Sequence, residues 1–193
     1  MKTILFKLFE KYSEKTLISS GIIFTLLGSF LAYTFNIRFD GILDLHVVNN
    51  TSLFDALSDN LINVICLTLF LYISSKYINR KTRLIDIVST AMVARTPLYI
   101  LPIFNINKLI TKSSEELIEY ADPELIGEIS PLTWLTTITF GIITMIFIIW
   151  YITLLFNGFK VASNAKGKVP IVLFILSLLL AEILSKFLII QLT

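Results

Sequence analysis

The sequence predicts an all-α integral membrane protein, a bundle of five transmembrane helices with its N-terminus in the cytoplasm and its C-terminus outside. Three observations lead to this prediction. The 193 residues are 55% hydrophobic and 16% charged, whereas a soluble domain is about one quarter charged. Five apolar stretches approach the length of roughly 20 residues that a transmembrane helix needs. Loops rich and poor in Lys and Arg alternate along the chain, as cytoplasmic and external loops do.

The predicted spans follow one another without a Gly/Ser-rich or Pro-rich linker, so we expect a single membrane domain over residues 1–193. We expect the first span to persist in the folded protein, because its apolar run is too long for the core of a signal peptide and no Ala-x-Ala site follows it. The spans are residues 17–35, 57–75, 84–104, 132–156 and 169–191.

Basic residues set the expected orientation. They gather in the N-terminal tail and in the loops after the second and fourth spans, and short loops rich in Lys and Arg face the cytoplasm. These residues are Lys2, Lys7, Lys11, Lys15, Lys76, Arg80, Lys81, Arg83, Lys160, Lys166 and Lys168. The opposite side carries Arg38, Lys108 and Lys112. Five spans then place the two termini on opposite sides of what we expect to be a bacterial inner membrane.

Two segments outside the spans mix apolar and polar residues. Residues 2–15 place apolar side chains on one helical face and lysines largely opposite. This pattern predicts a short amphipathic helix, which either lies on anionic headgroups or extends the first span. Residues 39–57 include Asp40 and Asp44 among apolar side chains. They are too polar to cross the bilayer, so we expect them at the membrane interface.

The first span carries a face of small residues. Lipid provides no hydrophobic drive between helices, so small side chains that let two backbones approach closely are typical of helix contacts in membranes. The small residues lie four, three and four positions apart, and they are Gly21, Thr25, Gly28 and Ala32. We expect this face to pack against a neighbouring span.

The fourth span carries a polar stripe at helical spacing. Its members are Thr133, Thr137, Gly141 and Thr144. Threonines in a span either bond to their own helix while packing against a neighbour, or they line a polar path for a substrate. Both interpretations are open at the level of the sequence.

The third span contains two prolines. Pro97 and Pro102 each remove a helical hydrogen bond and clash with the preceding turn, so we expect a kinked or unwound outer half. Arg95 lies just before the first of these breaks. Broken helices in mid-membrane recur in transporters, but kinks are common in any helical bundle.

Ionisable side chains lie inside two of the predicted spans. Arg95 is in the third span, and Glu182 and Lys186 are in the fifth. Such a group costs a few kcal/mol or more in hydrocarbon unless it is paired or wetted. Both spans run outward, and a rise of about 1.5 Å per residue gives Arg95 and Glu182 similar depths. The sequence therefore predicts an ion pair between them.

Other pairings are compatible with the same positions. Lys186 follows Glu182 by four residues on the same helical face, which favours a pair along the helix. Lys186 is also placed to meet Asp59 at the outer end of the second span. We take Arg95, Glu182, Lys186 and Asp59 as the candidate intramembrane polar site. It serves either as a structural clamp that fixes helix register or as a site for a ligand, ion or proton.

Two segments resemble a known family. One is Leu-Ile-Asp-Ile-Val-Ser-Thr-Ala-Met-Val-Ala-Arg-Thr-Pro-Leu-Tyr at residues 84–99, followed by a hydrophilic loop and a long span that opens near Trp134. The other is Trp-Tyr-Ile-Thr-Leu-Leu-Phe-Asn-Gly-Phe-Lys at residues 150–160, followed by a short basic loop and a final span. With five spans and a cytoplasmic N-terminus, the chain resembles the Yip family of Ypt-interacting membrane proteins in its short bacterial form.

This resemblance covers nearly the whole chain and implies a five-helix membrane domain. In eukaryotic members it implies roles in vesicle traffic and contact with Rab-type GTPases. The chain departs from those members because it has no long hydrophilic N-terminal region and no Asp-Leu-Tyr-Gly-Pro motif. The departures argue against GTPase binding and favour a bacterial membrane protein.

These observations favour a non-enzymatic membrane scaffold or accessory protein that binds partner membrane proteins, lipids or a second copy of itself. The alternative is a small oligomeric permease or channel that uses Arg95 and Glu182. We expect no catalytic residues, cofactor or nucleic-acid partner. His46 is the only histidine and Cys66 the only cysteine, so a metal site is not expected either.

Overall fold

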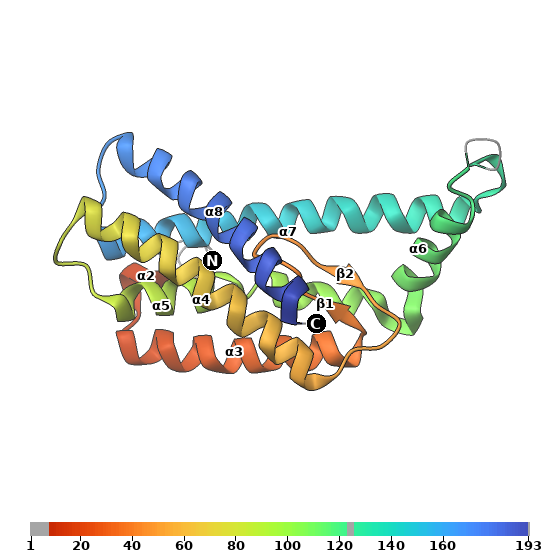
Figure 1. Ribbon diagram of the computed structural model, residues 1–193, viewed down its shortest axis with the longest axis horizontal. Coiled ribbons are helices and arrows are strands. Elements are labelled where there is room, and N and C mark those ends of the chain that lie inside the picture. Colours follow the sequence, from red (N-terminus) through yellow and green to blue (C-terminus); the bar gives the residue numbers. More distant parts are fainter. Residues whose placement is uncertain (1–7, 123–125, 193) are drawn as a thin grey trace.

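The computed structural model describes residues 8–122 and 126–192 and is an α-helical bundle with one small β-hairpin (Figure 1). Five of its helical segments are long and apolar enough to cross a membrane, as predicted. The helices are α2 (Leu8–Lys11), α3 (Glu14–Thr34), α4 (Leu53–Ile78), α5 (Leu84–Ala94), η1 (Leu98–Lys108), α6 (Leu109–Glu119), η2 (Ile126–Glu128), α7 (Pro131–Ser163) and α8 (Val169–Leu192). The hairpin strands are β1 (Ile37–Arg38) and β2 (His46–Val47).

Polar caps fix where two of the long helices begin. Ser52 and Asp55 exchange side-chain and backbone hydrogen bonds in a capping box, so α4 begins at Leu53, before the predicted span. Ser130 accepts a hydrogen bond from the backbone of Thr133, and Pro131 occupies the first turn of α7. Asp59 therefore lies inside α4, where its carboxylate needs a partner from a neighbouring element.

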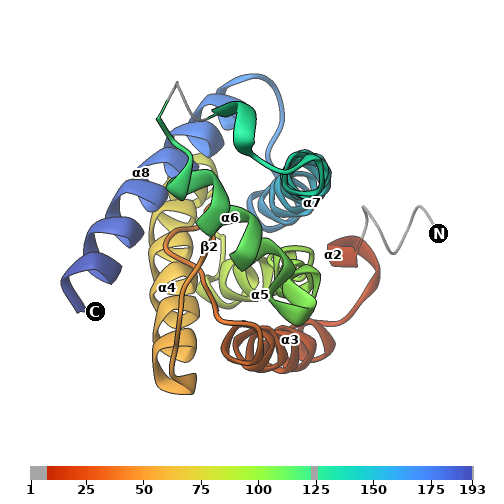
Figure 2. The same cartoon turned by 90° about the vertical axis from the view of Figure 1, so that its right-hand side faces the viewer.

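The third span is the centre of the bundle. The helix α5 packs against α3, α4 and α7, and η1 continues it against α3 and α7, while α4 pairs with α8 (Figure 2). The α-helix ends at Ala94, and the chain then follows 3-10 turns that contain Pro102. Loss of the proline hydrogen bonds explains this change, so the expected break in the third span is confirmed. Arg95 is the residue at the break.

The N-terminal helix differs from the prediction. Its first part, residues 1–7, lies outside the described residues. The described part, α2, ends at Lys11, because Ser13 accepts a hydrogen bond from the backbone of Thr16 and starts α3 as a new helix. A continuous helix to residue 15 was therefore a wrong prediction. Phe9 is buried with Leu17 and Val93, so the apolar face of α2 packs on the bundle.

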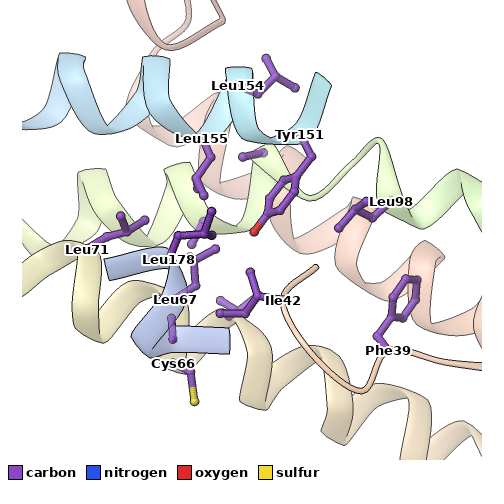
Figure 3. Close-up of a cluster of buried hydrophobic side chains, with 14 of the residues drawn as sticks. Phe39, Ile42, Cys66, Leu67, Leu71, Leu98, Tyr151, Leu154, Leu155 and Leu178 are labelled. Carbon is purple, nitrogen blue, oxygen red and sulfur yellow. The ribbon is translucent and has the colours of Figure 1, made fainter. Parts of the chain in front are cut away.

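Part of the segment between the first two spans is buried in the bundle, which the expectation of an interfacial segment did not include. Its strands pair antiparallel, with Ile37 opposite Val47, and the chain between them enters the bundle (Figure 1). Phe39 and Ile42 are 1% and 0% exposed, and both belong to the main hydrophobic core. In that core, Ile42 lies between α4 and Tyr151 of α7 (Figure 3). We call residues 39–45 the re-entrant loop.

Candidate functional site

The re-entrant loop places backbone N–H and C=O groups inside the membrane domain, where they need hydrogen-bond partners. Non-helical backbone at membrane depth is tolerated only where protein or trapped water satisfies its N–H and C=O groups. Side chains from three different spans satisfy these groups along the loop. The predicted intramembrane polar residues are among them.

Arg95 holds the middle of the loop. Its side chain is fully buried. The guanidinium donates a hydrogen bond from Nη1 to the Ile42 carbonyl at 3.0 Å and from Nη2 to Oδ1 of Asn60 at 3.4 Å. It also lies over the rings of Phe39 and Tyr99, with Cζ 5.7 Å from each centroid. Aromatic faces attract a cation through their quadrupole, so the two rings partly replace the solvent that Arg95 has lost.

Two asparagines of α4 extend this network. Asn60 donates to Oγ of Ser29 on α3 at 3.0 Å, so a chain of polar contacts links Arg95 to two neighbouring helices. Asn63 donates to the Phe39 carbonyl at 2.8 Å. Both asparagines are fully buried. Neither was predicted as a site residue, because an amide in a predicted span carries no charge to draw attention to it.

Glu182 holds the next peptide group of the loop. Its Oε2 accepts a hydrogen bond from the backbone N–H of Leu43 at 2.9 Å. A Cβ at Gly41 would lie 2.5 Å from Oε1, so a larger residue there would require this carboxylate to shift. Lys186 lies 3.3 Å from Oε1 and 2.8 Å from Oδ2 of Asp44, at the outer end of the same loop.

The predicted ion pair between Arg95 and Glu182 is therefore wrong. Among the ion pairs of the described residues, none joins these two side chains; Glu182 pairs with Lys186 instead. Arg95 binds the carbonyl of Ile42 and Glu182 binds the N–H of Leu43, so the two charges act on neighbouring residues of one loop. Arg95 and Glu182 lie at similar depths and so reach the same loop, but their side chains do not contact each other.

Asp59 also has a different partner from the one considered for it. Arg38 of β1 makes two hydrogen bonds to its carboxylate, at 2.8 and 2.5 Å. This fork geometry is the strong form of a charge-assisted contact. The hydrogen bonds with Asp59 raise the pKa of Arg38. The contact ties the hairpin to α4, on which Asp59 is fully buried.

His46 closes the hairpin on its outer side by contacting the carboxylate of Asp40. This hydrogen bond raises the pKa of the imidazole, against the opposing effect of partial burial. Within the described part of the chain, no three His, Cys, Asp or Glu side chains are grouped so as to hold a metal ion. The contact with Asp40 joins His46 of β2 to the start of the re-entrant loop.

The raised pKa of His46 predicts a pH dependence. Because the folded value exceeds the unfolded one of about 6.5, the stabilisation is fully present below that pH and is lost as the pH rises through the folded value. We expect the thermal midpoint to fall by about 1–3 °C more in the unmodified protein than in His46→Gln between about pH 6 and 8.5. The effect is small because the side chain is half-exposed. Equal pH responses of the two proteins would contradict the assignment.

Two buried polar atoms beside the loop stay unpaired. Nε of Arg95 and the hydroxyl of Tyr151 find no hydrogen-bond partner among the described residues. Tyr151 is fully buried, and its hydroxyl points into the core toward Ile42 (Figure 3).

The small-residue face of α3 supports the site from the opposite side. Gly21 and Gly28 lie against Met92 and Tyr99, where a Cβ would come within 2.8 Å and 2.3 Å of the neighbouring side chain. Thr25 lies between them, with its Oγ1 3.4 Å from the Tyr99 hydroxyl. Ala32 is fully buried. Tyr99 therefore contacts Gly28 of α3 as well as Arg95 and Phe39.

The threonine stripe of α7 does not form one surface. Thr133 donates to Glu116 of α6, whereas Gly141 is exposed, with nothing within 4 Å of its Cβ position. Thr137 is half-buried, and the Oγ1 of Thr144 has no partner among the described residues. An apolar hollow of about 290 Å³ beside α7 is lined instead by Thr136 and Thr139 with apolar neighbours. The stripe thus provides no continuous polar lining.

The comparisons with known proteins add no relative: no protein-family model, no curated protein and no solved structure matches this chain.

Proposed function

We propose that this protein is a non-enzymatic membrane scaffold or accessory protein of the Yip type that binds partner membrane proteins through its lipid-facing helices. The observation that carries the proposal is the enclosure of Arg95. Its side chain is fully buried, and the protein's own loop and Asn60 take its hydrogen bonds. A buried arginine whose hydrogen bonds go to the protein itself stabilises the fold and does not line a path for a substrate.

The helix α7 offers a surface for a partner helix. Leu135, Ile138, Ile142, Met145 and Ile149 alternate at spacings of three and four residues, and each is more than half exposed. Alternation of this kind brings apolar side chains into one seam, as in coiled coils. The outer part of α7 extends beyond the other spans and is accompanied there by α6 (Figure 1).

Site-specific photo-crosslinking in native membranes tests this role. A photoreactive residue at Ile142 on α7 should give discrete protein adducts. The same residue at Ile183 on α8, which is 68% exposed compared with 58% for Ile142, serves as the matched control and should give lipid adducts. Lipid adducts alone at both positions would contradict the scaffold role.

A permease or channel remains the second candidate, because the unpaired Nε of Arg95 and hydroxyl of Tyr151 leave polar capacity in mid-membrane. Substitution of Tyr151 by Phe distinguishes the two. If the protein is a permease or channel, the Tyr151→Phe variant should stay folded but lose its cellular phenotype. A scaffold would keep its Ile142 adducts and its phenotype.

The orientation of the bundle belongs to the same proposal. The basic loops that follow α4 and α7 lie at one end of the bundle, and the hairpin and α6 lie toward the other (Figure 1). We expect a reporter that is active only in the periplasm to be active when fused after Thr193 and silent when fused after Lys81. The opposite pattern would reverse the topology.

A further inference from the structure

We propose that the cleft between the end of α7 and the start of α8 binds the phosphate headgroup of an anionic phospholipid. The cleft has a volume of about 320 Å³. Its lining residues are Phe156, Lys160, Ala165, Lys166, Gly167, Pro170 and Ile171. This site lies apart from the proposed partner surface of α7, so each proposal can be tested independently of the other.

The charge of the cleft favours an anion. Lys160 and Lys166 contribute two exposed ammonium groups, and none of the described residues that line the cleft is acidic. Nζ of Lys160 lies over the ring of Phe156, 5.7 Å from its centroid, so the aromatic wall of the cleft helps to hold this ammonium group beside the cleft.

The surroundings of the cleft favour a lipid over a soluble anion. Ile171 and Val172, in the first turns of α8, are 44% and 57% exposed, and the apolar surface of the spans begins there. A headgroup in the cleft would thus place its acyl chains directly against α8. Basic pockets between transmembrane helices are known to take anionic headgroups for this reason.

The backbone shapes the cleft. Asn164 ends α7 in the left-handed conformation, and its N–H returns to the carbonyls of Lys160 and Val161. Gly167 has φ of +85°, a region that glycine enters without steric cost. These two residues turn the chain tightly, so Lys166 faces the same cleft as Lys160.

Native mass spectrometry of the purified protein in a neutral detergent tests the site. The protein is titrated with phosphatidylglycerol or with phosphatidylcholine of the same chains. The unmodified protein should bind phosphatidylglycerol more tightly. Because each lysine near an anionic surface contributes about 1 kcal/mol, Lys160→Gln/Lys166→Gln should weaken that Kd about 30-fold and leave the phosphatidylcholine Kd unchanged.

The double variant Arg80→Gln/Lys81→Gln is the matched control, because it removes the same charge from exposed positions at the same end of the bundle. It should change the Kd less than threefold, on the order of 0.6 kcal/mol. Equal losses in the two double variants, or equal binding of the two lipids, would overturn the proposal. Displacement of the lipid by inorganic phosphate alone would also overturn it, in favour of a soluble-anion site. Should the double variant misfold, Lys166→Gln alone should still weaken binding about fivefold.

Discussion

Substitution of Arg95 by methionine should lower the free energy of unfolding by about 2–4 kcal/mol. The change removes the donors to the Ile42 carbonyl and to Asn60, both inside the core. A buried acceptor left without a donor costs about 1–3 kcal/mol, and a methionine side chain offers no donor in place of the arginine. Unfolding in a neutral detergent, followed by circular dichroism, measures the loss.

Two further variants make this prediction specific. Arg95→Lys should cost nearly as much, because one ammonium group cannot reproduce the planar fork that reaches two acceptors. Tyr99→Phe keeps the ring beside the guanidinium and loses only the 3.4 Å contact with Thr25, so it should be mild. If Arg95→Met unfolds like Tyr99→Phe, Arg95 does not hold the re-entrant loop.

Gly28→Ala should destabilise the protein by about 1–3 kcal/mol, a typical cost of overpacking. The new Cβ would lie 2.3 Å from Cγ of Tyr99. Tyr99 has little room to retreat, because its ring stands edge-on to Phe39, with centroids 5.8 Å apart, and lies beside Arg95. The strain would therefore reach the re-entrant loop. Thermal unfolding of the purified variant in detergent measures the effect.

Gly141→Ala is the matched control for Gly28→Ala. Both glycines lie inside long apolar helices, but nothing lies within 4 Å of the Cβ position at Gly141. Alanine favours a helix over glycine by roughly 0.5–1 kcal/mol, so this variant should be neutral or slightly more stable. Equal destabilisation by the two substitutions would mean that the loss comes from the helices themselves and not from the α3 contact.

The architecture was accessible from the sequence because it depends on local properties. Runs of about 20 apolar residues predict spans whatever their partners are. The prolines at 97 and 102 remove hydrogen bonds wherever the helix lies, so the break after Ala94 was predictable as well. A small-residue face shows where a backbone can approach, and Gly28 does lie against Tyr99.

The re-entrant loop was not predictable from composition alone. Asp40 and Asp44 made residues 39–57 look interfacial, and both carboxylates do stay partly exposed, where they contact His46 and Lys186. The apolar Phe39 and Ile42 between them enter the core. The only local signal was Gly41, whose missing side chain leaves space for Glu182.

The same limitation explains the wrong pairing of the buried charges. Depth along a helix fixes one coordinate, and Arg95 and Glu182 do agree in that coordinate well enough to reach adjacent residues of the loop. Their rotation and their distance depend on what lies between the helices. An inserted backbone segment offers both a carbonyl and an N–H, so it can satisfy a cation and an anion separately.

A double-mutant cycle with Arg95→Met and Glu182→Met tests most directly whether the two residues hold one loop. Each single variant should detach residues 39–45, and the second contact then no longer exists to be lost. The double variant should therefore cost about as much as the worse single variant, with an interaction energy of about 1–3 kcal/mol. Strictly additive losses would contradict a shared loop. A double variant more stable than either single variant would instead support a direct ion pair between Arg95 and Glu182.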